Sequence, residues 1–141
     1  MIKLLTKIEL YSKSNPEYLR LIRATIDQVC QIAGFNRLES SKIVLAVDEA
    51  CSNVIRHAYL GEPDKEIYIK CTIEKKLLRI RIVDHGIQVD PKKIKPRPLD
   101  EIRPGGLGVH LIKSVMDRVR YKNLADSGNE LTMIKYMTKG V

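Results

Sequence analysis

The chain has 141 residues, of which 44% are hydrophobic and 30% are charged, and these proportions are typical of one folded globular domain spanning residues 1–141. No run of about 20 apolar residues is present, so the sequence predicts no membrane span and no membrane partner. The formal net charge of +8 favours acidic ligands or partners. One Phe, no Trp and six scattered Tyr provide no stacking platform for bases, so we expect no direct nucleic-acid binding.

The first half of the chain predicts one strand and two helices. The first dozen residues alternate between polar and apolar side chains, as in a strand. Asn15 and Pro16 then have the positions of an N-cap and a first helical residue, and Gly34 has that of a left-handed C-cap. A second helix is expected over about Glu39 to Leu60. Its expected apolar stripe is Ile43, Val47, Ala50, Val54 and Ala58.

The second half predicts two hairpins on either side of a loop and a helix. The alternating runs KEIYIKCTIE and LLRIRIVD are joined by two lysines, which is typical of a β-hairpin. Residues 87–104 contain four prolines and five Lys or Arg without any period, as in a functional lid or a disordered loop. GGLGVHLIKSVMD then begins on glycines and continues as a helix. RVRYKN and ELTMIKYMT predict a closing hairpin.

This order of elements predicts an α/β (α+β) two-layer sandwich. It consists of a mostly antiparallel, mixed sheet with three helices on one face. Strictly alternating βαβ units are missing, so a doubly wound sheet is not expected. Cys30, Cys51 and Cys71 are odd in number and lie in apolar periodic segments, which indicates neither a disulfide framework nor a zinc site. A reducing cytoplasm is the expected location.

Three polar residues follow one another at steps of four in the second helix, within VDEACSNVIRHAY: Glu49, Asn53 and His57. At about 100° per residue they face away from the apolar stripe, and a solvent-exposed face would look the same. However, Glu49 has no Lys partner four residues later. A carboxylate can accept a proton, and an amide oxygen is a hard ligand that suits Mg²⁺.

Two further stretches have the residue types of a nucleotide site. In RIVDHGI, Asp84 ends a strand that should be buried, and Gly86 allows close approach of another backbone; an ordinary turn has the same pattern. In PGGLGVHLI, Gly105, Gly106 and Gly108 open a helix, where free N–H groups bind anions; a flexible linker is the alternative. Walker, Rossmann and protein-kinase motifs are absent from the sequence.

In this order, the motifs Glu-x-x-x-Asn, Asp-x-Gly and Gly-Gly-x-Gly resemble those of the Bergerat-fold ATPases, the superfamily of gyrase, Hsp90, histidine kinases and MutL. Within this superfamily four segments are similar to the anti-sigma-factor serine kinases of the RsbW and SpoIIAB type. These segments are AVDEACSNVIRHAY, VDHGIQVDP, GGLGVHLIKSVMDRVRY and LTMIKYM. The resemblance covers nearly the whole chain.

The resemblance implies roles for individual residues. Asn53 would coordinate Mg²⁺ on the ATP phosphates, and Glu49 would be the base that activates the attacking hydroxyl. Asp84 would accept a hydrogen bond from the adenine amino group, with Gly86 beneath the base and Thr132 supporting this contact. Residues 87–104 would be the ATP lid. The remaining expected contacts with the nucleotide are Arg103, Gly105, Gly106, Leu107, Gly108 and, as a lining residue, His57.

The function implied by the resemblance is that of an ATP- and Mg²⁺-dependent protein serine kinase that is also an anti-sigma factor. It would phosphorylate an anti-anti-sigma protein with a STAS domain and sequester a sigma factor, and it would form a homodimer. The alternative is a regulatory module that binds ATP and a protein partner without kinase activity.

Overall fold

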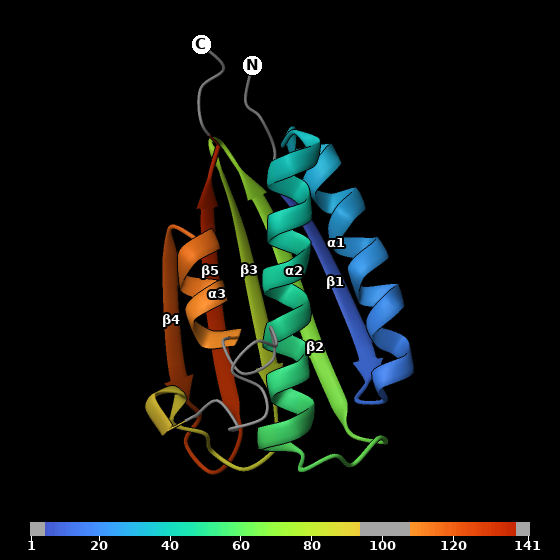
Figure 1. Ribbon diagram of the computed structural model, residues 1–141, viewed down its shortest axis with the longest axis vertical. Helices are drawn as coiled ribbons and strands as arrows, with labels where there is room; N and C mark the ends of the chain where they lie inside the picture. Colours follow the sequence, from blue (N-terminus) through green and yellow to red (C-terminus); the bar gives the residue numbers. More distant parts are fainter. Residues whose placement is uncertain (1–4, 94–107, 138–141) are drawn as a thin grey trace.

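The computed structural model describes residues 5–93 and 108–137, which form one five-stranded sheet with three helices on one face (Figure 1). The strands are β1 (Thr6–Lys13), β2 (Glu66–Glu74), β3 (Leu77–Asp84), β4 (Arg118–Asn123) and β5 (Asn129–Tyr136). The helices are α1 (Leu19–Ala33), α2 (Arg37–Asn53) and α3 (Gly108–Val115). Short turns of other helix types are η1 (Pro16–Tyr18), η2 (Val54–Ala58) and η3 (Pro91–Lys93). The predicted two-layer sandwich is confirmed.

The strands are arranged in the order β1-β2-β3-β5-β4. The prediction allowed for a mixed sheet, but in the described part of the chain all four strand pairs are antiparallel. The last strand, β5, lies inside the sheet between β3 and β4. The end of β3 is therefore a direct neighbour of the start of β5.

Capping residues fix the ends of the first two helices. The side chain of Asn15 accepts a hydrogen bond from the Glu17 N–H at 2.9 Å, and Gly34 ends α1 at φ 101°, as predicted. The side chain of Asn36 accepts from the Glu39 N–H at 2.8 Å, so α2 begins at Arg37, two residues before the predicted start.

The core lies between the helices and the inner face of the sheet. The predicted hairpin of β2 and β3 forms with the expected pairing, so that Ile69 lies opposite Ile82 and Cys71 opposite Ile80. Ile22 and Ile26 of α1, Ile43 and Val47 of α2 and Ile112 of α3 complete the core. The three cysteines are free and buried in it.

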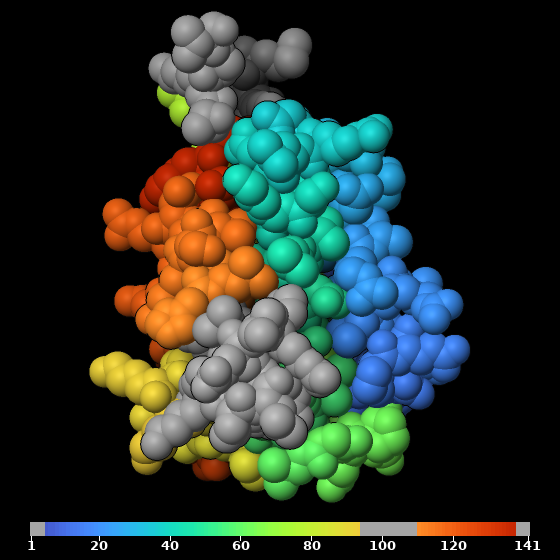
Figure 2. All heavy atoms as spheres, in the orientation of Figure 1, coloured from blue at the N-terminus to red at the C-terminus, as the bar shows by residue number. Residues whose placement is uncertain are grey.

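Helix α2 lies between α1 and α3 as well as over the sheet (Figure 1), and side chains of the three helices cover this face together (Figure 2). It is therefore buried on more sides than its apolar stripe indicated. Glu49, which was expected on a face turned away from the core, is only 7% exposed, and Val54 of the predicted stripe is half-buried. The expectation was wrong here because it treated α2 as a helix that packs on one surface.

The other face of the sheet is not covered by a described helix, and it is rich in basic side chains. Its cations include Lys70, Arg79, Arg81, Arg118, Arg120 and Lys122. Ion pairs join Arg79 to Glu74 and Arg81 to Glu130. No helix among the described residues is long and apolar enough to span a membrane.

Candidate functional site

A cleft opens at the end of the sheet where β3 finishes, under the last turns of α2. It contains about 500 Å³ of empty space, counting its open mouth. The described residues that line it come from α2, η2, β3, β4 and β5 and from the segment after β3, including Ala50, Asn53, Val54, Asp84, Val89 and Asn129. The cleft thus brings together Asn53 and Asp84, two of the residues that the sequence predicted for one site.

The sheet forms the floor of the cleft as two rows of side chains. In the first row, Ile82, Leu131 and Tyr121 lie side by side across β3, β5 and β4. The second row is polar and consists of Asp84, Asn129 and Asn123, each of which is two positions away from the first-row residue of its strand. Residues two apart on a strand share one face, so both rows face the helices. An apolar surface therefore lies directly beside a row of hydrogen-bonding groups.

Asp84 is the only carboxylate of the second row, and it is 2% exposed. Its Oδ1 accepts hydrogen bonds from the Gly86 N–H at 2.9 Å and from Asn129 Nδ2 at 3.0 Å. Burial raises the pKa of the Asp84 carboxyl, while the bonds from Gly86 and Asn129 oppose this rise. The carboxylate is held in place from two sides and offers its remaining acceptor capacity to the cleft.

Asn129 is the residue that the sequence analysis missed. Its Nδ2 also donates to the Ile87 carbonyl at 2.8 Å, and its Oδ1 accepts from the Val89 N–H at 2.8 Å and from Asn123 Nδ2 at 2.9 Å. It therefore joins Asp84, the segment after β3 and β4. The period of two along the final hairpin was the available signal, because it places Asn129, Leu131 and Met133 on one face.

Thr132, which the sequence predicted beside Asp84, lies on the opposite face of the sheet. It pairs with Arg81 on one side and with Arg120 on the other, among the charged residues of the uncovered face. Adjacent residues of a strand point to opposite faces, so an assignment that is wrong by an odd number of residues places the side chain on the wrong side. The supporting position for Asp84 is occupied by Asn129.

The end of α2 changes from an α-helix to the π-helical turn η2, in which the Tyr59 N–H donates to the Val54 carbonyl at 2.9 Å. The Ala58 carbonyl then accepts from the Ile87 N–H at 2.9 Å. A Cβ on Gly86 would lie 2.3 Å from the Ala58 carbonyl oxygen, so only glycine fits there. Turns of this kind often occur at functional sites.

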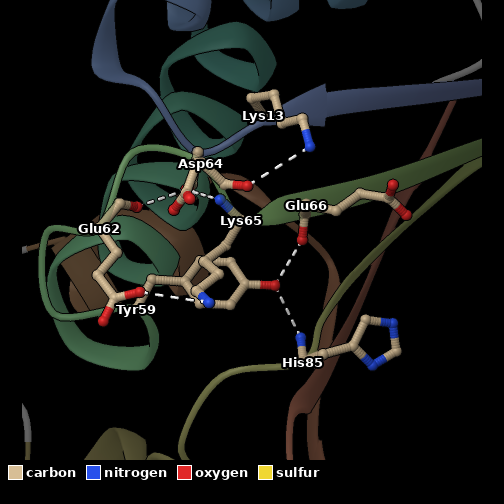
Figure 3. Close-up of polar contacts among 8 residues, drawn as sticks. Lys13, Tyr59, Glu62, Asp64, Lys65, Glu66 and His85 are labelled. Atoms are coloured by element: carbon tan, nitrogen blue, oxygen red, sulfur yellow. Dashed lines mark hydrogen bonds and ion pairs between the residues drawn. The ribbon is translucent and has the colours of Figure 1, made fainter.

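The hydroxyl of Tyr59 ties this turn to the sheet (Figure 3). It donates to the Glu66 carbonyl at 2.5 Å and accepts from the His85 N–H at 2.8 Å. Because His85 stands between Asp84 and Gly86, these bonds fix the backbone on which the Asp84 carboxylate depends. His85 contributes its backbone to this arrangement.

Glu49 does not line the cleft that contains Asn53 and Asp84. It faces a neighbouring cleft between α1 and α2, with Pro16, Leu19, Ser52, Ile55 and Arg56. Its Oε2 is buried without a hydrogen bond in the described part of the chain and lies 3.9 Å from Arg56 Nη2. Burial raises the pKa of Glu49, which Arg56 partly offsets.

Arg56 is the link between the two clefts. Its Nη2 also donates to Asn53 Oδ1 at 2.9 Å. The candidate base and the candidate metal ligand therefore share one guanidinium group, although they line different clefts.

The other predicted contacts fall outside this arrangement or outside the described residues. His57 is half-buried in η2, but it is not among the described residues that line the cleft. Gly108 is the first residue of α3. Four predicted residues lie outside the described ranges: Arg103, Gly105, Gly106 and Leu107.

The side chains that line the cleft suit the base of an adenine nucleotide. The apolar row offers a surface for the face of a purine, and Asp84 offers an acceptor for an exocyclic amine. Asn53 supplies one hard oxygen ligand. No group of three His, Cys, Asp or Glu among the described residues could hold a metal by itself. Mg²⁺ commonly binds through one or two protein oxygens together with phosphates and water.

Comparisons with known proteins point in the same direction. The family model described as the histidine kinase-like ATPase domain matches residues 12–135. The serine-protein kinase RsbW of Bacillus subtilis (strain 168) is 32% identical over 138 residues, which cover 92% of this chain and 85% of that protein. RsbW of Listeria monocytogenes serotype 4b (strain F2365) is 34% identical over 141 residues, covering 94% and 88%.

Solved structures share the fold at low sequence identity. The RsbU and RsbW domains of Rv1364c from Mycobacterium tuberculosis match with a TM-score of 0.67 and 14% identity, over 93% of this chain and 32% of that chain. The histidine kinase domain of a blue-light activated histidine kinase from Erythrobacter litoralis EL346 matches with a TM-score of 0.56 and 16% identity, over 86% and 60%.

Proposed function

The chain belongs to the histidine kinase-like ATPase family, among its RsbW-type serine-protein kinases, and from this premise we propose how it acts. It transfers the γ-phosphoryl group of ATP to a serine of an anti-anti-sigma protein with a STAS domain. When that protein is already phosphorylated, the chain binds a sigma factor and keeps it from RNA polymerase. We propose further that it works as a cytoplasmic homodimer, with residues 1–141 as one ATPase domain and residues 87–104 as its lid.

The observation that supports ATP as the phosphoryl donor is the position of Asp84. A buried carboxylate at the end of β3, held by Gly86 and Asn129, lies beside an apolar row that would accept a purine face. The adenine amino group donates hydrogen bonds and would pair with this acceptor. Guanine has a carbonyl at the corresponding position and would leave the carboxylate facing another acceptor.

In the proposed transfer, the serine hydroxyl oxygen attacks the γ-phosphorus atom. The new O–P bond forms as the bond from the γ-phosphorus to the β,γ-bridging oxygen breaks, and ADP leaves. Glu49 accepts the proton of the serine hydroxyl. Its buried carboxylate has a raised pKa, which makes it a stronger base than an exposed glutamate.

Further groups of the chain would hold the phosphates. Asn53 Oδ1 would bind Mg²⁺, which when bound neutralises phosphate charge and orients the γ-phosphoryl group. The N–H groups at the start of α3 from Gly108, together with Gly105, Gly106 and Leu107, are proposed to contact the phosphates, and Arg103 to reach the γ-phosphoryl group.

The alternative function is a regulatory module that binds ATP and a partner but does not transfer phosphate. The separation of Glu49 from the cleft of Asn53 and Asp84 favours this alternative. For transfer, the acceptor serine has to reach Glu49 from the neighbouring cleft while the γ-phosphoryl group extends toward it from the nucleotide.

Incubation with radiolabelled ATP, Mg²⁺ and a STAS-domain protein from the same organism separates the two functions. We expect label on one serine of the STAS protein, and none on a variant of that protein with this serine replaced by alanine. ATP binding without any labelling would reject the kinase and favour the regulatory module. Absence of ATP binding would reject both.

A further inference from the structure

Tyr121, on the inner face of β4, has a hydroxyl group without an identified function. The hydroxyl oxygen is buried and has no hydrogen-bond partner among the residues that the structure describes. The residue lies at the end of the apolar row of the cleft, next to Leu131 on β5. A buried hydroxyl without a hydrogen bond is less stable than one that is paired.

Tyr59 shows how the same group is satisfied elsewhere in this chain. Its hydroxyl bonds to two backbone groups, the Glu66 carbonyl and the His85 N–H (Figure 3). Tyr59 is buried among structural contacts, whereas Tyr121 lines the space that the ligand would enter. The two tyrosines can therefore be compared directly, because the Tyr59 hydroxyl has hydrogen-bond partners and the Tyr121 hydroxyl has none in the described part of the chain.

The Tyr121 hydroxyl is a neutral donor. Burial raises the pKa of Tyr121 to about 12, so the group keeps its proton throughout the physiological range. It can therefore donate to an uncharged acceptor. The ring nitrogens of a purine are such acceptors at the edge of the base, and Tyr121, at the end of the row, would lie beside this edge while Ile82 and Leu131 support the face.

We propose that the Tyr121 hydroxyl donates a hydrogen bond to a ring nitrogen of the bound adenine. This inference rests on the proposed binding of ATP and deepens it. The base is then recognised at two places: Asp84 on β3 accepts from the amino group, and Tyr121 on β4 donates to the ring. The nucleotide supplies the partner that the hydroxyl lacks among the described residues.

The test compares Tyr121→Phe with Tyr59→Phe, which also removes a tyrosine hydroxyl but one that has hydrogen-bond partners in the fold. For Tyr121→Phe we expect ATP affinity to fall about three- to tenfold, because one hydrogen bond is lost. The melting temperature of the ligand-free protein should stay equal or rise, because the unpaired group is removed. Tyr59→Phe should lower the melting temperature, because it leaves the His85 N–H and the Glu66 carbonyl without their partner.

ATP analogues identify the acceptor atom. Among 1-deaza-, 3-deaza- and 7-deaza-ATP, the unmodified protein should bind one analogue weakly, by the same factor that Tyr121→Phe loses for ATP. Tyr121→Phe should not distinguish this analogue from ATP. Unchanged ATP affinity in Tyr121→Phe, an affinity loss that follows a lower melting temperature, or a loss that no deaza analogue reproduces would each overturn the inference.

These results also separate the inference from the proposed function. If the unmodified protein binds ATP and Tyr121→Phe binds it equally well, only the role of Tyr121 is rejected. If the unmodified protein does not bind ATP, the nucleotide site and the role of Tyr121 fail together.

Discussion

Asn129 donates from its amide nitrogen to both carboxylate oxygens of Asp84, at 3.0 Å and 3.3 Å. The two residues are 45 positions apart in the chain and become neighbours because β5 pairs with β3. Since the amide nitrogen can only donate, it fixes the carboxylate as the acceptor and limits its rotation. The pair thus presents an oriented acceptor to the cleft.

We predict that Asn129→Ala weakens ATP binding about tenfold and lowers the free energy of unfolding by about 1–3 kcal/mol, because Asp84 and the backbone of Ile87 and Val89 lose their partner. Thr132→Ala on the same strand is the matched control and should leave ATP affinity unchanged, since Thr132 lies on the other face. Calorimetric titration with ATP and urea unfolding measure both effects. Weaker ATP binding in Thr132→Ala than in Asn129→Ala would contradict this placement.

Glu49→Gln should abolish transfer and preserve binding. Glutamine has nearly the same shape but cannot accept the serine proton, so we expect the transfer rate to fall by at least about 100-fold. The affinity for ATP should change less than about threefold, because Glu49 does not line the nucleotide cleft. Labelling of a STAS acceptor and calorimetric titration give the two numbers. A variant that retains full transfer would exclude Glu49 as the base.

Asn53→Ala should remove the Mg²⁺-dependent part of nucleotide binding. Unmodified protein is expected to bind ATP more tightly with Mg²⁺ than with EDTA, and the variant should bind equally in both buffers. The comparison within each protein controls for general damage to the cleft. The control is Arg23→Ala in α1, which breaks an exposed ion pair with Asp48 of α2, the helix that contains Asn53. This variant should keep the Mg²⁺ effect. A full Mg²⁺ effect in Asn53→Ala would exclude Asn53 as the ligand.

The transfer rate should fall with decreasing pH earlier than an ordinary glutamate would allow. Only ionised Glu49 can accept the proton, and this form is lost as the pH drops through its pKa. Burial raises that pKa, with Asp48 adding to the rise and Arg56 opposing it, so the loss begins at a higher pH. Single-turnover rates at saturating ATP and acceptor measure this fall of the rate with pH. A midpoint at or below the usual pKa of glutamate would contradict the assignment of Glu49 as the base.

Most of the fold could be predicted from the sequence because its signals are local. The alternation of polar and apolar residues predicted β2 and β3, and the capping residues Asn15 and Gly34 predicted the ends of the first helical segment. The burial of Glu49 could not be predicted in this way, because it depends on the packing of α1 against α2. The residue pattern of one helix does not specify how many other helices pack against it.

The candidate site was predicted in part. Asp84 and Asn53 could be chosen because their motifs are short and lie on single elements. The partner of Asp84 depends on strand register, and the choice of Thr132 in place of Asn129 changed the face of the sheet. The π-helical turn after Asn53 has no simple sequence signal, yet it places Ala58 against Gly86.

The position of β5 inside the sheet has a consequence for how the chain folds during synthesis. Asn129 and Leu131 belong to the last strand, so a growing chain that has released only residues up to β4 lacks two of the six side chains that form the cleft floor. A ligand stabilises a folding state only if that state can bind it. ATP is therefore expected to leave early folding intermediates unaffected and to stabilise the protein only after β5 has entered between β3 and β4.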